Sequence, residues 1–340
     1  MDWYERARTS ALSRIHGTPL PRSDTQARVV FRSWYYFDPD GQQWMPARAT
    51  STTDNGGILG RDNDAPPLLT LLTWNIDASS ARAEDRVSEL IAYATAQLHP
   101  DVDIIFFQEV SRPALQQILK DETIRGSWFS SECDDRAWGN QSFATMTLLS
   151  KKRFALAGSE TTTLRVRVGS PRLGPVWRAS VPSRFGRDAL CCDIFTPSPN
   201  SFTRLTRTRL IKVHLDSLPL NPSYRPRQVS IISRFLRSAG RGLAAGDFNP
   251  VLEEDATLVK RNGLIDAWEA VHPGQPGCTW GTDGKQAYPP TRLDKVALLG
   301  LRPHDINVVD AKRLINADGQ ATDSENNSPW SDHHGLLCSF

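Results

Sequence analysis

Polar residues that could bind a metal ion and a phosphate follow four short apolar runs of this 340-residue sequence. Two later apolar runs are instead preceded by such residues. If the two later strands run antiparallel to the first four, all six clusters meet at one edge of a sheet sandwich, where sites gather. The clusters are Asn75-Ile76-Asp77, Gln108-Glu109, His214-Leu215-Asp216-Ser217, Gly246-Asp247-Phe248-Asn249, Arg292-Leu293-Asp294 and Ser331-Asp332-His333-His334.

The chemistry of these clusters favours a hard divalent cation. Glu109, with Asn, Asp and His neighbours and no thiolate, suits Mg²⁺, with Mn²⁺ as the alternative, better than Zn²⁺. Such a site suits phosphoryl transfer, in which the protein positions a water molecule and spreads transition-state charge. A lone Gln-Glu or Gly-Asp-x-Asn is usually an ordinary surface feature or an Asx-turn. The ordered set of six clusters therefore predicts a phosphodiesterase or phosphatase.

The elements that must position these residues are short strands and a few helices. Helical spacing places Val87, Leu90, Ile91 and Ala94 on one face of residues 84–98, and residues 225–236 show the same pattern. Many strands with covering helices predict an α/β fold, a layered sandwich. The expected strands are residues 68–74, 103–107, the neighbourhood of 148, 190–195, 210–215, 243–245, 296–299 and 335–340.

Residues 1–67 are predicted to be an N-terminal extension before a catalytic domain of residues 68–340. Residues 31–37 and 42–46 are aromatic-rich arms joined by Asp38-Pro39-Asp40-Gly41, which predicts a β-hairpin packed on the main domain. The Gly-, Asn- and Pro-rich stretch of residues 50–67 predicts a flexible linker.

Composition narrows the class of protein. With 39% hydrophobic residues, 23% charged residues and ten Trp, the chain can bury a large core, which excludes disordered, collagen-like and coiled-coil classes. It has no apolar run of the ~20 residues that cross a bilayer and no secretory signal pattern, so we expect an intracellular protein of the nucleus and/or cytoplasm. Five cysteines without a CxxC pair argue against disulfides and structural zinc.

Charge is unevenly distributed although the net charge is only +2. Residues 151–209 carry twelve Lys and Arg against Glu160, Asp188 and Asp193. This basic block could face phosphates. Solvated strand edges, where Lys and Arg discourage aggregation, explain it equally well.

The ordered motifs TWNID, QEV, HLDS, GDFN, RLD and SDHHGL resemble the endonuclease/exonuclease/phosphatase superfamily over residues 68–340. Within it, the segment from Ile265 to Trp280 and the ending SDHHGLLC are similar to the tyrosyl-DNA phosphodiesterase 2 branch, whose pattern has Glu at Asp216 and Trp at His334. The loop at 169–181 and the stretch 196–209 look expanded. The resemblance implies a DNase I-like, four-layered α/β sandwich in which two mixed β-sheets pack together and helices flank them.

The resemblance also implies roles for individual residues. Glu109 would bind Mg²⁺, and Asn75 would help to fix the phosphate. Arg187 would reach the phosphate, and Trp280 would stack on a nucleobase; Ser217 and Asp77 are further candidates for substrate binding. The remaining catalytic candidates, which would hold the attacking water or stabilise the phosphorus centre, are Asp247, Asn249, His214, His333, Asp294 and Asp332.

The main expectation is a Mg²⁺-dependent monomer that hydrolyses 5′-phosphotyrosyl bonds on DNA carrying a tyrosyl or peptide adduct. The nearest alternative is an abasic-site or other DNA endonuclease of the same superfamily. A non-catalytic binding protein on this scaffold is a further alternative. Every charged catalytic position is filled, which argues against it.

Overall fold

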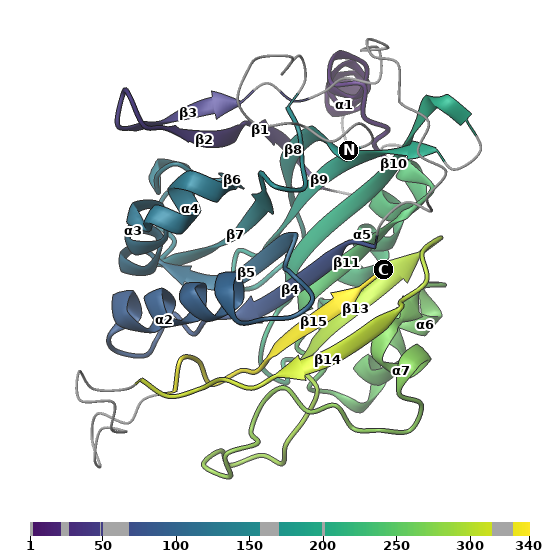
Figure 1. Ribbon diagram of the computed structural model, residues 1–340. Helices are drawn as coiled ribbons and strands as arrows, with labels where there is room; N and C mark the ends of the chain where they lie inside the picture. The colour runs from purple at the N-terminus through teal and green to yellow at the C-terminus, as the bar shows by residue number, and fades with distance from the viewer. Residues whose placement is uncertain are drawn as a thin grey trace.

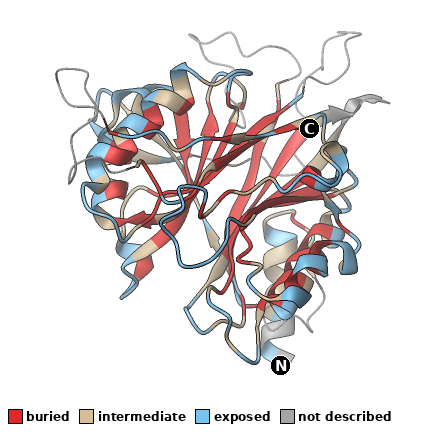
Figure 2. Cartoon of the chain, turned by 90° about the horizontal axis from the view of Figure 1, so that it is seen from below, coloured by how far each residue is buried: buried red, intermediate tan, exposed pale blue. Residues whose placement is uncertain are grey.

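Two β-sheets pack face to face and carry helices on their outer surfaces, which gives four layers (Figure 1). The structure is a computed structural model that describes residues 3–21, 27–47, 49, 68–156, 170–198, 201–314 and 329–340. The predicted α/β sandwich of two mixed sheets is therefore confirmed. Seen from below in Figure 2, the strands of both sheets are buried, whereas the helices expose their outer faces.

One sheet has eight strands and contains the first two predicted clusters. β4 lies parallel to β5, and β15 lies antiparallel to β4, as the sequence predicts. The order is β14 (Asp305–Val309), β15 (Gly335–Ser339), β4 (Thr70–Asn75), β5 (Ile104–Ser111), β7 (Phe143–Ser150), β6 (Trp128–Ser130), β2 (Trp34–Asp38) and β3 (Gln43–Ala47).

The other sheet has seven strands and contains the third and fourth clusters. β10 lies parallel to β11, and β13 lies antiparallel to β11. The order is β1 (Val29–Arg32), β8 (Arg172–Ser180), β9 (Asp188–Ser198), β10 (Ser201–His214), β11 (Gly242–Asp247), β13 (Asp294–Leu299) and β12 (Ile265–Asp266).

Three hydrophobic cores follow from the alternation of side chains along the strands. Leu71 and Leu243 point into the space between the sheets, whereas Leu72 packs under the helices that cover the eight-stranded sheet. Trp268 belongs to the central core. The helices are α1 (Trp3–Ile15), α2 (Ala83–Ala96), α3 (Arg112–Lys120), α4 (Glu122–Ser127), α5 (Arg225–Ala239), α6 (Leu258–Arg261) and α7 (Ala267–Val271), with short 3₁₀ helices at Arg136–Trp138 and Glu253–Thr257.

The three described strands of residues 1–67 belong to both sheets. β2 and β3 form a hairpin, and Tyr35 of β2 pairs with Ser130 of β6. The predicted first arm, residues 31–37, is wrong as a single strand, because β1 ends at Arg32 and pairs with β8 in the opposite sheet. The predicted linker, residues 50–67, lies outside the described residues.

The prediction of an expanded loop at residues 169–181 is wrong for most of its length. Arg172–Ser180 is β8, which lies between β1 and β9 and is buried from residue 173 to residue 179. Gly174 and Pro175 read as turn residues, but a β-bulge between Leu173 and Val176 accommodates them. Within the stretch 196–209, β9 ends at Ser198, β10 begins at Ser201, and the two strands pair antiparallel.

The two interpretations of the basic block both fail for its most buried members. Arg209 is fully buried and pairs with Asp193 at 2.8 Å, and Arg178 pairs with Glu132 at 2.6 Å. These cations therefore balance buried acids instead of facing phosphates or solvent.

Among the described helices, none is long and apolar enough to cross a membrane.

Candidate active site

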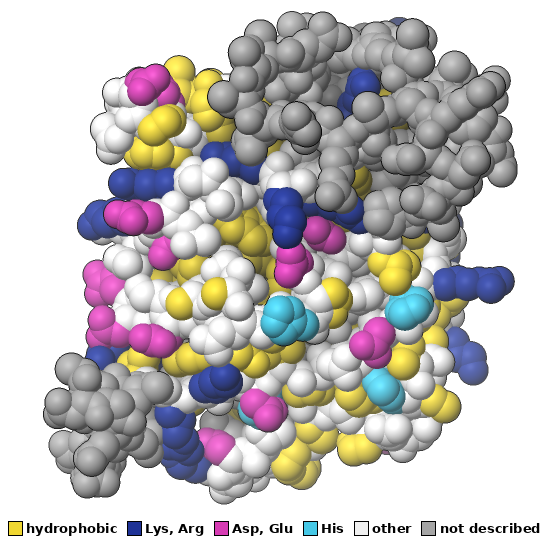
Figure 3. Space-filling view, in the orientation of Figure 1, with side chains coloured by type: hydrophobic (Ala, Val, Ile, Leu, Met, Phe, Trp, Pro, Cys, Tyr) yellow, Lys and Arg dark blue, Asp and Glu magenta, His cyan; other side chains and the backbone are white. Residues whose placement is uncertain are grey.

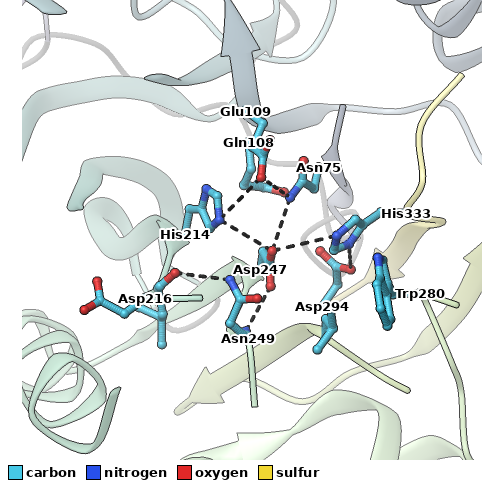
Figure 4. Close-up of polar contacts among 12 residues, drawn as sticks. Asn75, Gln108, Glu109, His214, Asp216, Asp247, Asn249, Trp280, Asp294 and His333 are labelled. Atoms are coloured by element: carbon cyan, nitrogen blue, oxygen red, sulfur yellow. Dashed lines mark hydrogen bonds and ion pairs between the residues drawn. The ribbon is translucent and has the colours of Figure 1, made fainter. Parts of the chain in front are cut away.

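The strand ends bring the predicted clusters together at one edge of the sandwich (Figure 4). Asn75 and Gln108 are partners at the ends of parallel strands, and His214 and Asp247 are partners in the other sheet. Asp294, the first residue of β13, lies opposite Asp247. The predicted meeting of strand ends and strand beginnings is thus what the two sheets produce.

Glu109 reaches the site because β5 is irregular at this point. Its φ is 54°, and the pairing of β5 with β7 shifts between Phe107 and Val110. Oε1 of Glu109 accepts a hydrogen bond from Nδ2 of Asn75 at 3.2 Å, and Oε2 accepts one from the backbone N–H of Ala78 at 3.1 Å. The side chain remains 22% exposed, so one carboxylate face is open to solvent.

Asn75 joins the two sheets through its amide. Its Nδ2 also donates to Oδ2 of Asp247 at 3.2 Å, and its Oδ1 accepts from the backbone N–H of Asp77 at 3.1 Å. The side chain is almost fully buried. Asn75 therefore joins the carboxylates of Glu109 and Asp247 through one amide nitrogen.

Asp247 and Asn249 lie on a turn that only a glycine can begin. Gly246 has a φ of 137°, and a Cβ there would lie 2.0 Å from the carbonyl oxygen of Val213. Oδ1 of Asp247 accepts from the backbone N–H of Asn249 at 2.9 Å, while Nδ2 of Asn249 donates to the carbonyl of Leu215 at 3.2 Å. Burial, together with the negative charge of Asp294, raises the pKa of Asp247.

His333 is held by Asp294 in a hydrogen-bonded chain. Its Nδ1 lies 2.8 Å from Oδ2 of Asp294, which also accepts from Oγ1 of Thr279 at 2.7 Å. Burial alone would lower the pKa of His333, but Asp294 and then Asp247 outweigh it and raise that pKa to about 10. His333 is therefore a cation at neutral pH, with Nε2 4.0 Å from Oδ2 of Asp247.

His214 is neutral, unlike His333. Its Nε2 lies 3.6 Å from Oδ2 of Asp247 and 3.8 Å from Oε1 of Glu109. Burial, followed by the positive charges of Arg187 and Lys212, lowers the pKa of His214 well below its usual value. The site thus pairs a neutral imidazole at His214 with an imidazolium at His333.

Arg187 is presented by a loop that Asp216 anchors. The Asp216 carboxylate accepts from the hydroxyl of Ser183 and, at 3.0 Å, from the backbone N–H of Arg184. The Arg187 guanidinium lies 5.2 Å from the ring centre of Phe143. Burial lowers the pKa of Arg187, while the negative charges of Glu109 and Asp247 favour its charged form.

Asp216 belongs to one of the predicted clusters, but the sequence alone assigns it no role of its own. The structure shows an anchoring role, since the buried Gln228 of α5 also donates to its carboxylate at 3.0 Å.

Trp280 and Asp332 lie beside His333. Trp280 forms a β-bridge with His333, and its Nε1 donates to Oδ2 of Asp332 at 3.2 Å. The indole is half-buried.

The last two predicted residues are placed differently. The Asp77 carboxylate caps its own loop by accepting from the backbone N–H of Ser79 at 2.9 Å and from the Ser80 hydroxyl. Ser217 is half-buried after Asp216. Their roles in substrate binding stay predictions.

The donor set fits a hard divalent cation. Mg²⁺ is usually held by one or two carboxylates and completes its shell with water and phosphate oxygens. Glu109 supplies a partly exposed carboxylate, Asn75 an amide, and the surrounding site has no thiolate. The described residues contain no group of three or more His, Cys, Asp and Glu side chains placed to hold a metal by themselves.

Comparison with known proteins agrees with this geometry. The model of the Endonuclease/Exonuclease/phosphatase family matches residues 72–333, so the chain belongs to this family. Among solved structures, humanized D. rerio TDP2 superposes with a TM-score of 0.59 at 18% identity, over 80% of this chain and 98% of that one. TDP2 is the enzyme of the tyrosyl-DNA phosphodiesterase 2 branch, and the resemblance to it is confirmed at the level of the fold.

Two further structures show the same fold. D. rerio TDP2 complexed with a single-strand DNA product superposes with a TM-score of 0.58 at 19% identity, covering 80% of this chain and 98% of that one. The human Nocturnin catalytic domain, with a bound sulfate, gives 0.50 at 17% identity, covering 81% and 95%. No curated protein sequence matches this chain.

Proposed function

We propose that this protein is a Mg²⁺-dependent phosphodiesterase that hydrolyses the bond between a tyrosine and the 5′-phosphate of DNA, a repair reaction that removes trapped topoisomerase adducts. The observation that carries the proposal is the joining of Glu109 and Asp247 through Asn75, beside a cationic His333. The fold shared with TDP2, one structure of which holds a single-strand DNA product, supports the choice of substrate.

The residues divide the reaction between them. Asp247, whose raised pKa suits proton acceptance, and Asn249 would orient a water molecule and take up its proton as the water oxygen attacks phosphorus. The phosphorus–oxygen bond to tyrosine then breaks, leaving a 5′-phosphate on the DNA. His333 and Arg187 stabilise the charge that develops on the phosphate oxygens. Mg²⁺, held by Glu109, would neutralise part of the same charge.

A site that assists mainly through the positive charges of His333 and Arg187 suits a tyrosyl leaving group. A phenol has a pKa of about 10, so the phenolate departs with less help from a general acid than a sugar alkoxide does. An abasic-site endonuclease must expel such an alkoxide. This difference in leaving group favours the tyrosyl substrate over the endonuclease alternative.

A substrate panel tests the proposal. 5′-tyrosyl DNA, abasic duplex DNA and a plain single-stranded oligonucleotide are incubated with the protein, with and without Mg²⁺, beside the shape-preserving variant Asp247→Asn. We expect Mg²⁺-dependent release of tyrosine by the parent, with loss of turnover in the variant. Faster cleavage of the abasic duplex would support the endonuclease alternative, and no turnover of any substrate would support a binding protein.

Trp280 provides a test of DNA as the substrate. Its place beside His333 allows the ring to stack on a base next to the scissile phosphate. Base stacking contributes ~1–3 kcal/mol, so we expect Trp280→Ala to slow turnover of tyrosyl oligonucleotides by roughly ten- to a hundredfold. A nitrophenyl phosphodiester of thymidine should be affected much less. The buried Trp268→Ala serves as a comparison, since its loss should lower thermal stability instead; the same loss in Trp280→Ala would mark Trp280 as a core residue.

A further inference from the structure

Arg86 of helix α2 is a buried cation whose hydrogen bonds all go to backbone carbonyls. The side chain is 2% exposed, and a guanidinium has five N–H donors. All five are used. Nε donates to Ala81 at 2.9 Å, Nη1 to Ile76 at 2.9 Å and Trp330 at 2.7 Å, and Nη2 to Asp77 at 2.7 Å and Ser80 at 3.1 Å.

These carbonyls belong to two segments that carry the proposed catalytic residues. Residues 76–81 directly follow Asn75, and Trp330 precedes Ser331, Asp332 and His333. Arg86 and Trp330 are 244 positions apart in the sequence, so the contact is a long-range one. The guanidinium therefore fixes the loop after β4 against the segment that enters β15.

A second set of hydrogen bonds joins the same two segments. The hydroxyl of Ser331 donates to the backbone carbonyl of Asn75 at 2.6 Å and accepts from the backbone N–H of His333 at 3.0 Å. Nε1 of Trp74 donates to the carbonyl of His333 at 2.9 Å. Together with Arg86, these bonds set the position of His333 relative to Asn75.

Among the described residues, Arg86 forms no ion pair with a carboxylate. The charges that act on it are those of Asp77 and Asp332, one in each of the two segments. Burying a cation without a paired acid is costly, and a hydrophobic residue would fill the same place more cheaply. Lysine could not replace it, because the ammonium group lacks the planar five-donor fork. The arrangement of the donors is therefore the property that only arginine supplies.

We propose that Arg86 is a positioning residue that holds Asn75 and His333 at the separation which phosphodiester hydrolysis requires. The inference rests on the proposed function for its activity measurement alone. Arg86 does not contact the phosphate or the metal in the proposed reaction. It acts through the backbone of the two segments, and a misplacement of about 1 Å can slow a reaction roughly a hundredfold.

The test uses Arg86→Lys, which keeps the charge but loses the fork. Arg82→Lys is the matched control, since Arg82 precedes the same helix and is exposed. We expect kcat of folded Arg86→Lys to fall roughly ten- to a hundredfold while its Kd for a single-stranded 5′-phosphate oligonucleotide stays within about threefold. Arg82→Lys should match the parent in both.

Ser331→Ala keeps the test decisive if Arg86→Lys does not fold, because it weakens the same link from the opposite segment. It should also lower kcat without a matching change in Kd. An NMR measurement adds a readout that is independent of turnover. The proton that joins Nδ1 of His333 to Asp294 should shift or broaden in both variants and remain unchanged in Arg82→Lys.

Parental kcat in folded Arg86→Lys and Ser331→Ala, with an unshifted His333 resonance, would overturn the inference. A loss of kcat that accompanies a loss of thermal stability, with that resonance unchanged, would also overturn the inference, because it indicates a merely structural role. If the parent hydrolyses no tyrosyl DNA, the proposed function fails, whereas the resonance still decides the role of Arg86.

Discussion

At the scale of single residues, the site depends on one carboxylate that a strand irregularity turns toward solvent. We expect Glu109→Gln to raise the Mg²⁺ concentration needed for half-maximal activity and to lower activity by orders of magnitude, because a hard cation prefers a charged oxygen. The fold should survive, since a Gln oxygen can still accept a hydrogen bond from Asn75 or Ala78. Mg²⁺ titrations of parent and variant measure the effect.

Glu84→Gln is the control for this prediction, since Glu84 is an exposed carboxylate in the first turn of α2. It should leave the Mg²⁺ titration unchanged. Equal metal dependence in the parent and Glu109→Gln would remove Glu109 from the metal site.

The charge of His333 makes a prediction about stability and pH. Its pKa is about 10 in the folded protein and about 6.5 in the unfolded chain. A raised pKa stabilises the fold fully below about pH 6.5, and the contribution is lost as pH rises toward 10. The difference in unfolding free energy between the parent and His333→Gln should therefore shrink across this window, by on the order of a few kcal/mol.

Urea unfolding of both proteins at several pH values between 6 and 10 measures this difference. Titration of lysines and tyrosines affects both proteins alike and cancels. A difference that stays constant with pH would show that His333 is not charged in the folded state.

At the scale of elements, the loop that carries Arg187 is fixed at several points. Asp216 binds its beginning, and Nε2 of Gln141 donates to the carbonyl of Gly186 at 2.9 Å. Asp216→Asn replaces an acceptor oxygen with a donor that faces the other donors, which costs about 1–3 kcal/mol. We expect faster amide hydrogen exchange at residues 184–187 and a several-fold higher KM for DNA.

Exchange measured by mass spectrometry on the parent and Asp216→Asn checks this prediction. Asp283→Asn, at an exposed loop aspartate, is the control and should leave residues 184–187 unchanged. Unaltered exchange in Asp216→Asn would mean that the remaining contacts hold the loop without Asp216.

The strands that carry the site could be predicted because each joins an apolar run to a polar cluster. β8 could not, since Gly174, Pro175 and Arg178 look like loop residues until Arg178 pairs with Glu132, in the loop after β6 of the opposite sheet. The burial of Arg86 could have been predicted from the sequence. Helical spacing puts it on the same face as Leu90 and Ala94, where a cation needs an internal partner.

Two features of the site could not be predicted from the sequence. The φ of 54° at Glu109 arises from the pairing of β5 with β7, which a single sequence does not contain. His214 is neutral and His333 is charged because their neighbours differ. Residue type and spacing therefore identified the members of the site, while tertiary pairing sets their protonation.

At the scale of the whole molecule, charge is distributed between the interior and the surface. Lys, Arg, Asp and Glu side chains are interspersed over the described part of the face in Figure 3, in keeping with a net charge of +2. The basic block of residues 151–209 contributes partly to the interior, where Arg178 joins the two sheets. It donates to Glu132 at 2.6 Å and to the carbonyl of Thr145 at 2.7 Å across the sandwich.

The same side chain reaches the site loop. Nη1 of Arg178 lies 3.0 Å from both carboxylate oxygens of Asp188, which directly follows Arg187. Breaking a buried ion pair by removing one partner costs about 3–5 kcal/mol, because the other charge is left buried and unpaired. We therefore expect Arg178→Met to lower the free energy of unfolding by that amount while the molecule still unfolds in one step, since the sheets share a central core.

Urea unfolding followed by both tryptophan fluorescence and circular dichroism measures the effect. Arg136→Met is the matched control, because Arg136 pairs with Asp134 at 2.7 Å but is 88% exposed, and such surface pairs contribute about 0–1 kcal/mol. A loss in Arg178→Met no larger than that of the control would show that Glu132 and Asp188 are stabilised without Arg178. Separate transitions for the two probes would show instead that the sheets unfold independently and that Arg178 is what couples them.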